Sequence, residues 1–452
     1  MKSQSNAKIE IGQLIDERKL SPLQILIIVM SALVVWLDGY HIQSMSLVVP
    51  TLAKEWAIKS TDFKMVNSSA IIGILLGSAF IASMGDRWGR RKILIISMVI
   101  VGLSSIGTGY SNSMMHLIIW RFLTGLGLGA SIPNATALTS DYVPAKRRAA
   151  LVTLMFSGVS IGAFTSSYIA PPIVQAFGWR GMFTIGGVAP LFMCLLLAVT
   201  IPESIRLLLE RFPGDPRIPK ILARLEPGID ARSVYAARKQ EVNQQSVIGL
   251  FSKTYKKGTL LLWSVFIVNM FILYFLVFWL PTLLSAQGWS STQAMRGTGI
   301  IQIGGVLGGF ILSWFVDRGK TVMATVTAYA ITGIAFVLFS VLPASGPSWW
   351  VLLFIVGSGI SGGQFVLNAL AAGFYPPMIR STGVGWVYSV GRIGAVISGY
   401  AGGVILVMNV ATVLGMLAIP VIICILGVLM FRNVFQTTPV PSATAKQQSP
   451  AR

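Results

Sequence analysis

The sequence predicts an all-α membrane protein with twelve transmembrane helices in two pseudosymmetric six-helix bundles. The first reason is composition: 54% of the 452 residues are hydrophobic, 11% are charged, and the mean hydropathy is +0.74. Such a chain is too apolar to be a soluble domain of this length. The second reason is a series of long apolar runs, and the third is an internal repeat between the two halves.

Twelve apolar runs each approach the length of about 20 residues that a helix needs to cross ~30 Å of hydrocarbon. They lie at 22–50, 67–84, 93–111, 114–139, 150–176, 181–201, 258–284, 294–316, 323–343, 349–375, 383–406 and 411–431. A polar loop at 202–257 separates the sixth run from the seventh, which predicts an N-terminal bundle at 22–201 and a C-terminal bundle at 258–432. The flanking segments are 1–21 and a Gln-, Ser-, Thr- and Pro-rich tail, 433–452, which we expect to be disordered.

The formal net charge of +20 indicates an orientation in the membrane rather than binding to nucleic acid. Of the 35 Lys and Arg residues, the predicted outer loops hold only Lys54, Lys59, Lys64, Arg180 and Arg296. Because Lys and Arg are concentrated in cytoplasmic loops, we expect both termini, the central loop and the tail to lie in the cytoplasm.

The two halves repeat each other. The stretch "GDRWGRRK" after the second run has a shortened counterpart, "VDRGK", after the eighth, so that Asp86 and Asp317 lie 231 residues apart. Pro50 and Pro281 share this offset. A six-plus-six duplication is the plan of the major facilitator fold, which binds its substrate near the midplane between the halves.

The repeated Asp-Arg stretch predicts a gate. Its carboxylate, turn glycine and cations can form ion pairs with neighbouring helix ends in one conformation and lose them in another. A topology anchor is the alternative, but the recurrence of the Asp-Arg pair in the second half favours the gate. We assign this role to Asp86, Arg87, Gly89, Arg90, Arg91, Asp317 and Arg318.

One acidic residue, Asp38, falls deep in a predicted span. A charge there costs several kcal/mol and usually marks an ion or proton path. We therefore predict that Asp38 carries the coupling proton, with a static ion pair between helices as the alternative. His41 lies one turn later on the same face. Because imidazole titrates near physiological pH, it is a candidate for proton coupling or substrate binding, and a hydrogen-bonded core histidine is its alternative.

Two arginines, Arg121 and Arg392, also fall deep in predicted spans. Arginine keeps its charge and matches a carboxylate with a fork of donors, so an excess of arginine over aspartate predicts an anion-binding cavity. We assign Arg392 to the substrate carboxylate and Arg121 to proton coupling with the first helix or to the gate, each with a structural ion pair as the alternative. In the internal repeat, Arg392 of the second half corresponds to Ser160 of the first half, and Asn269 of the second half corresponds to Asp38 of the first. Three glycines after Arg121, at 125, 127 and 129, predict close helix packing.

Polar and aromatic side chains in the C-terminal half complete the predicted substrate site. Gln364 and Asn368 share one helix face, and unpaired amides are costly in a membrane. Aromatic rings with a few amides suit a flat ring that carries polar groups. The predicted contacts are Asn269, Tyr274, Gln364, Asn368 and Tyr388, with Arg392 and His41.

These motifs resemble those of the aromatic acid:proton symporters of the major facilitator superfamily. The resemblance covers almost the whole chain outside the termini and the central loop. It is carried by "LDGYH", "GDRWGRRK", "RFLTGLGLGASIPNATALTSDYVPAKRRA", "PESIRLLL", "WLPTLL" and "LNALAAGFYPPMIRSTGVGWVYSVGRIGA". It implies proton-driven uptake of an aromatic carboxylate across a bacterial cytoplasmic membrane, with roles for Asp38, Asp86, Arg121 and Arg392. The chain departs from the family at two places. It has His41 where the family has a second acid, and it has Phe365 and Val366 where we expect small residues in the family.

Other functions fit the sequence less well. A proton-coupled exporter would typically carry a Gly-x-x-x-Gly-Pro-x-x-Gly-Gly pattern in the fifth helix, but here Gly158 and Gly162 are followed by "AFTSS". A transceptor that senses aromatic acids is a further alternative. No nucleophile-base set or metal-ligand spacing indicates an enzyme. We expect no cofactor, metal or nucleic-acid partner, only protons, a small organic anion and the lipid bilayer, and we expect a monomer.

Overall fold

A computed structural model describes residues 9–16, 20–226, 234–235, 247–344, 346–376, 379–405 and 410–437. The fold in these ranges is helical, as predicted. The strands found there are β1 (Ile9–Glu10) and β2 (Val234–Tyr235), which pair in parallel. The tail predicted to be disordered lies, from residue 438 onward, outside the described residues.

The chain forms two compact units. The first unit comprises Met1–Lys239, Phe275–Ile303 and Val396–Val410. The second unit comprises Gln240–Tyr274, Gly304–Ala395 and Ala411–Arg452. The domain boundary that the central loop suggests stays a prediction.

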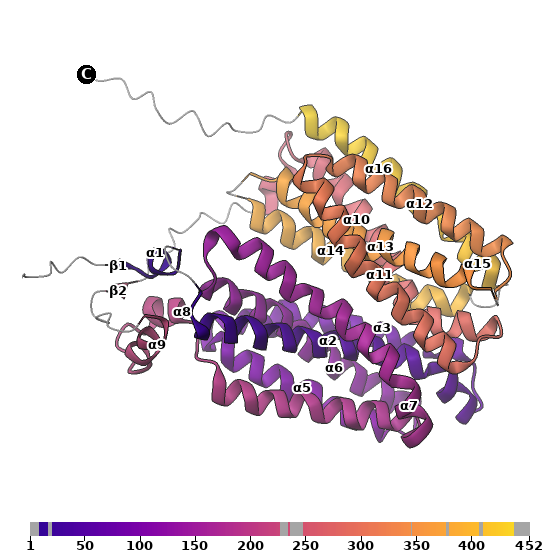
Figure 1. Cartoon of the computed structure of the whole chain (residues 1–452), viewed down its shortest axis with the longest axis horizontal. Helices are drawn as coiled ribbons and strands as arrows, with labels where there is room; N and C mark the ends of the chain where they lie inside the picture. The colour runs from indigo at the N-terminus through magenta and orange to yellow at the C-terminus, as the bar shows by residue number, and fades with distance from the viewer. Residues whose placement is uncertain are drawn as a thin grey trace, which may run out of the picture. The chain divides into compact units, whose positions relative to one another are not determined.

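The first unit is built from the helices of the N-terminal half. They are α1 (Ile11–Asp16), α2 (Pro22–Glu55), η1 (Ser60–Phe63), α3 (Lys64–Leu76), η2 (Gly77–Ile81), η3 (Ala82–Met84), α4 (Gly85–Trp88), α5 (Arg90–Gly109), α6 (Met114–Tyr142), α7 (Ala145–Thr200), α8 (Ile205–Arg211) and α9 (Arg217–Leu225). In Figure 1, α2, α5, α6 and α7 run side by side, and α2 packs against both α6 and α7.

The second unit contains most of the helices of the C-terminal half. They are η5 (Val247–Phe251), α10 (Lys256–Ala286), α11 (Ser291–Asp317), α12 (Thr321–Val341), α13 (Ser348–Phe374), α14 (Arg380–Ile405), α15 (Val410–Met416) and α16 (Ala418–Thr437). Helices α12, α13 and α16 pack together. The end of α10, the start of α11 and the end of α14 belong to the first unit.

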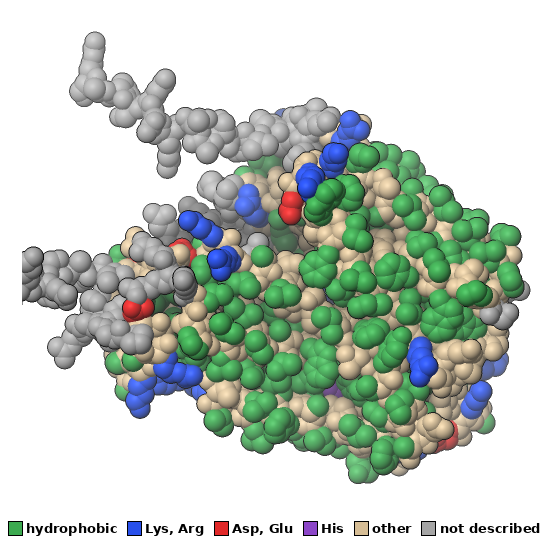
Figure 2. Space-filling view, viewed as in Figure 1, with side chains coloured by type: hydrophobic (Ala, Val, Ile, Leu, Met, Phe, Trp, Pro, Cys, Tyr) green, Lys and Arg blue, Asp and Glu red, His purple; other side chains and the backbone are tan. Residues whose placement is uncertain are grey.

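The helices account for the twelve predicted spans. Ten helical stretches of the described chain are long and apolar enough to cross a membrane. One of them, Ala145–Thr200, covers both the fifth and the sixth predicted spans. Gly178, at φ 67°, interrupts this helix between the two spans. Helix α14, of 26 residues, covers nearly all of the eleventh span. Apolar side chains such as Val199 and Val341 are exposed, and they dominate the surface in Figure 2, as lipid contact requires.

Helix α2 is fixed at both of its ends. At its start, Ser21 and Gln24 form a capping box, and Pro22 occupies the first turn. The Gln24 side chain also donates to the Tyr142 carbonyl at 2.6 Å, which ties α2 to the end of α6. At the far end, Glu55 accepts hydrogen bonds from Trp179 (2.8 Å) and Arg180 (2.7 Å) of α7.

Glycines bring the helices of the first unit close together, as the sequence predicted. A Cβ at Gly125 of α6 would lie 2.1 Å from the Ala70 carbonyl oxygen of α3, and one at Gly129 would lie 2.2 Å from that of Ile74. On α2, a Cβ at Gly39 would lie 2.0 Å from the Val159 carbonyl oxygen. Helix α2 is thus held in backbone contact with α7, directly beside Asp38.

Candidate functional site

Asp38 lies in the interior of the first unit. Its side chain is fully buried, and one carboxyl oxygen, Oδ2, accepts a hydrogen bond from Ser131 Oγ of α6 at 2.5 Å. The other oxygen, Oδ1, has no hydrogen-bond partner in the described part of the chain. The predicted carboxyl group is therefore removed from solvent and held by one neutral donor.

Arg121 and His41 lie on the same two helices as Ser131 and Asp38, α6 and α2. Arg121 is 2% exposed, and its Nη2 donates to the His41 carbonyl oxygen at 3.0 Å. Its Nε and Nη1 find no acceptor among the described residues. The His41 ring is also fully buried and lies edge-on to Tyr40, with ring centroids 5.2 Å apart. The α2–α6 contact thus gathers all three residues predicted to couple protons.

This cluster combines a removable charge with a permanent one. Among the described residues, no ion pair joins Asp38 to Arg121 or to another cation. Burying a charge without a partner is costly, and a carboxyl group escapes that cost by taking up a proton, whereas arginine cannot shed its charge. Proton uptake and release at Asp38 would therefore change the charge of the cluster while Arg121 stays cationic.

The second unit holds a chain of hydrogen bonds through the predicted amides. Tyr329 of α12 donates its hydroxyl proton to Asn269 Oδ1 of α10 at 2.8 Å. Asn269 Nδ2 donates to Gln364 Oε1 of α13 at 2.7 Å, and Gln364 Nε2 donates to Asn368 Oδ1 at 2.9 Å. Asn269 and Tyr329 are fully buried. The structure thus brings together three amides that the sequence selected.

Arg392 lies at the half-buried end of this chain. It interacts electrostatically with the hydroxyl groups of Tyr274 and Tyr388, and the Asn368 side chain lies near the Tyr388 hydroxyl. Tyr388 precedes Arg392 by one turn of α14, so both side chains project from one helix face. The predicted substrate residues of the second unit therefore form one group, whereas His41 belongs to the first unit.

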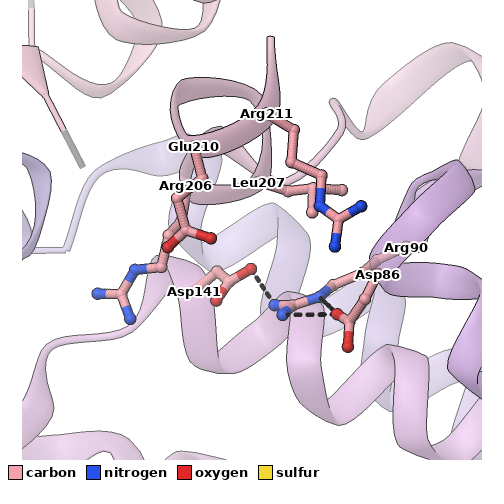
Figure 3. Close-up of a pocket in the computed structure, with 7 residues that line it drawn as sticks. All are labelled: Asp86, Arg90, Asp141, Arg206, Leu207, Glu210 and Arg211. Atoms are coloured by element: carbon pink, nitrogen blue, oxygen red, sulfur yellow. Dashed lines mark hydrogen bonds and ion pairs between the residues drawn. The ribbon is translucent and has the colours of Figure 1, made fainter. Parts of the chain in front are cut away.

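The predicted gate of the N-terminal half forms a network of charges. Arg90 Nη2 lies 3.2 Å from Asp86 Oδ1, and Arg90 Nη1 pairs with Asp141 at the end of α6. Figure 3 shows Arg90 between the two carboxylates, at the edge of a cavity of about 180 Å³. Helix α8 closes this cavity with Arg206, Leu207, Glu210 and Arg211.

Glu203 extends this network to α8. Its Oε1 accepts from the Arg91 backbone N–H at 3.1 Å, and its neighbour Ser204 donates to Asp141. Gly89, at φ 112°, lets the two segments approach, because a Cβ there would lie 2.2 Å from Glu203 Oε2. Four predicted gate residues, Asp86, Gly89, Arg90 and Arg91, thus take part in the network or border it.

The other predicted gate residues lie outside this network. Arg87 is exposed. In the second half, Arg318 packs over the Trp314 ring, 3.3 Å from its centroid, and Asp317 is exposed with no ion pair among the described residues. The repeated Asp-Arg motif therefore has different surroundings in the two halves, and its gating role stays a prediction.

Four polar residues of these clusters were not selected from the sequence: Ser131, Asp141, Glu203 and Tyr329. Three of them stand inside stretches that carry the family resemblance. A hydroxyl or carboxyl group within such a motif was the available signal, but nothing in the sequence showed which partner it would meet.

Long apolar helices that enclose a buried carboxyl group and buried guanidinium groups define a multi-pass membrane transporter. Residues 25–397 match the Major Facilitator Superfamily. The chain belongs to this superfamily and, within it, to the aromatic acid:proton symporters, as its similarity to aromatic acid transporters over most of its length shows.

Three relatives illustrate this similarity. The 4-hydroxybenzoate transporter PcaK of Pseudomonas aeruginosa is 34% identical, over 94% of this chain and 96% of its own. The gallate transporter of Pseudomonas putida is 31% identical, over 95% of each chain. The benzoate transport protein of Acinetobacter baylyi is 29% identical, over 96% of this chain and 95% of its own. These relatives are transporters rather than enzymes.

The fold also matches solved transporters. The inward open conformation of the xylose transporter XylE from Escherichia coli has a TM-score of 0.70 at 16% identity, covering 93% of this chain and 98% of XylE. This likeness confirms the predicted major facilitator fold.

Proposed function

We propose that this protein imports an aromatic carboxylate together with protons across a bacterial cytoplasmic membrane by alternating access, as a monomer with both termini in the cytoplasm. The full-length similarity to transporters of 4-hydroxybenzoate, gallate and benzoate supports the substrate class. The single observation that carries the coupling is Asp38, a fully buried carboxyl group with one neutral hydrogen-bond donor and no ion partner in the described chain.

The proton step follows from the surroundings of Asp38. A carboxyl group in this environment changes the charge of its site when it takes up or releases a proton, and it does so without breaking an ion pair. We propose that Asp38 is protonated from the outside and deprotonated to the cytoplasm in each cycle. Arg121, held on the His41 carbonyl, keeps a positive charge in the same cluster throughout.

The substrate step follows from the surroundings of Arg392. Arginine offers a bidentate fork to a carboxylate, and Tyr274 and Tyr388 lie beside it to receive an aromatic acid. We propose that Arg392 binds the substrate carboxylate. The charge network of Asp86, Arg90 and Asp141 would then open and close the cytoplasmic side.

The proposal is tested with purified protein in vesicles and radiolabelled 4-hydroxybenzoate. An imposed inward proton gradient should drive accumulation of the label, and a protonophore should abolish it. Label that is expelled against its gradient would indicate an exporter. Label that binds without accumulating would indicate a sensor, and either result would overturn proton-coupled uptake. Light scattering on the detergent-solubilised protein tests the monomer.

A further inference from the structure

The amide chain of the second unit joins three helices and ends near a fourth, α14, which carries Arg392. It begins at the buried Tyr329 hydroxyl on α12, passes through Asn269 on α10, and continues through Gln364 and Asn368 on α13. Its last member, Asn368, lies near the Tyr388 hydroxyl on α14. The chain therefore connects a fully buried group with a half-buried one at the predicted substrate site.

Every hydrogen bond in this chain has the same direction, with the donor on the Tyr329 side and the acceptor on the Asn368 side. An amide oxygen only accepts and an amide nitrogen only donates, so the role of one atom in each amide fixes the role of the other. Asn368 Oδ1 already accepts from Gln364. Its nitrogen is thus the atom that can donate to the nearby Tyr388 oxygen, which would leave the Tyr388 hydroxyl proton available to an acceptor outside the chain.

Tyr329 sets this direction. If the chain ran the other way, Asn269 would donate to the Tyr329 oxygen, and the Tyr329 hydroxyl proton would need a different acceptor. Tyr329 is fully buried, and in the described residues its hydroxyl bonds to Asn269. A buried donor without an acceptor is costly, so the hydroxyl keeps the amides in the observed orientation. Aligned bonds also polarise one another, which strengthens the terminal donor.

We propose that Tyr329 is a positioning residue for substrate recognition, which acts through the amide chain to present the Tyr388 hydroxyl as a donor beside Arg392. Both groups then address one ligand group that only accepts hydrogen bonds, a carboxylate. This inference rests on the proposed function, in which Arg392 binds the substrate carboxylate. It adds that Asn269 and Gln364 transmit the orientation rather than touch the substrate.

The first test measures equilibrium binding of 4-hydroxybenzoate to the purified full chain. Tyr329→Phe removes one hydroxyl and frees the amides to turn, so binding should weaken about five- to tenfold, the effect of one lost hydrogen bond. The matched control is Tyr375→Phe. Tyr375 is a buried tyrosine of the same unit whose hydroxyl bonds to Thr259 at 3.1 Å, and its loss should change binding less than twofold.

A double-mutant cycle separates positioning from a general loss of structure. If Tyr329 acts through Tyr388, the variant with both Tyr329→Phe and Tyr388→Phe should bind as Tyr388→Phe does alone. Additive losses, or full affinity in Tyr329→Phe, would overturn the proposal. Should Tyr329→Phe fail to fold, Tyr388→Phe alone tests whether the Tyr388 hydroxyl donates to the carboxylate, as the proposal requires. It should weaken binding of 4-hydroxybenzoate more than that of 4-hydroxybenzamide, whose N–H₂ group is a donor, and equal losses would refute the inference.

Transport by the unmodified protein distinguishes this inference from the proposed function. If the protein binds 4-hydroxybenzoate but does not accumulate it with protons, proton-coupled uptake fails, and the cycle still decides the role of Tyr329. If the protein accumulates the label while the cycle is additive, the positioning role fails alone. If the unmodified protein binds neither 4-hydroxybenzoate nor benzoate, both proposals fail.

Discussion

Asp38 and Asn269 occupy equivalent positions in the two halves, but their hydrogen bonding differs. Asp38 has one neutral donor and an unpartnered oxygen in the described chain, and Arg121 of the same unit has two nitrogens without a partner there. Asn269 accepts from Tyr329 and donates to Gln364, and both bonds continue into a chain. If Asp38 carries the coupling proton, the first half holds a site whose charge changes, and the second half holds a neutral framework of hydrogen bonds. The duplicated halves would then divide proton coupling and substrate recognition between them.

The largest effect should come from Asp38→Asn. Asparagine keeps the size and the hydrogen bond to Ser131 but cannot carry a proton, so proton-driven accumulation of 4-hydroxybenzoate should be abolished. Uptake in energised vesicles measures this. The control is Asp62→Asn, a change at an acid outside the buried cluster, which should transport within about twofold of the unmodified protein, as is usual for surface substitutions. A variant that still concentrates the label with protons would remove the contrast between the halves.

Arg392→Ala should have the second largest effect. Losing a charge-assisted hydrogen bond to a carboxylate should weaken binding of 4-hydroxybenzoate about 10- to 100-fold. The loss should be much smaller for 4-hydroxybenzamide, because that ligand carries no charge. Titration calorimetry with the two ligands makes the comparison. Equal losses for both would show that Arg392 supports the fold and does not recognise the carboxylate.

The two Asp-Arg motifs should respond unequally to the same change. Arg90→Ala leaves the buried Asp141 without its ion partner, and we expect transport to fall about tenfold, because a buried charge without a counterion disturbs the whole network. Arg318→Ala removes a cation that packs on Trp314 at the surface, so transport should stay within about twofold. Initial uptake rates at equal protein in the membrane decide the comparison. Similar losses in both variants would indicate a symmetric gate.

The smallest effects we expect are on stability, and they come from exchanging the residue types of the equivalent positions. Asn269→Asp places a carboxyl oxygen opposite Gln364 Oε1, which breaks the chain of donors and should lower the free energy of unfolding by about 1–3 kcal/mol. Asp38→Asn removes a buried charge without an ion partner and should leave stability unchanged or raise it. Thermal unfolding of the purified variants tests both signs. A stability loss in Asp38→Asn would show that the carboxylate stabilises the first unit.

The sequence was sufficient to predict features that depend on one helix at a time. The apolar runs located the spans, the isolated charges located Asp38, Arg121 and Arg392, and the i, i+4 spacing paired Gln364 with Asn368. The apolar runs also separated the fifth span from the sixth, which the structure joins in one helix interrupted at Gly178.

Features that depend on two helices could not be predicted in this way. Ser131 lies 93 residues from Asp38, Tyr329 lies 60 from Asn269, and Asp141 lies 51 from Arg90. The periodicity of one helix shows which face is polar, but not which residue of a neighbouring helix lies opposite it. The rotation and the axial shift of packed helices decide that, and they depend on contacts such as those of Gly39 and Gly125.

Helix α2 is anchored to neighbouring helices at both of its ends. Gln24 holds one end to α6, Glu55 holds the other to α7, and Asp38 stands near the middle, where Gly39 touches the α7 backbone. Local bending of α2 would break these contacts. We therefore expect Asp38 to become accessible only when whole helices shift relative to one another, which would make proton exchange at one side chain depend on helix packing.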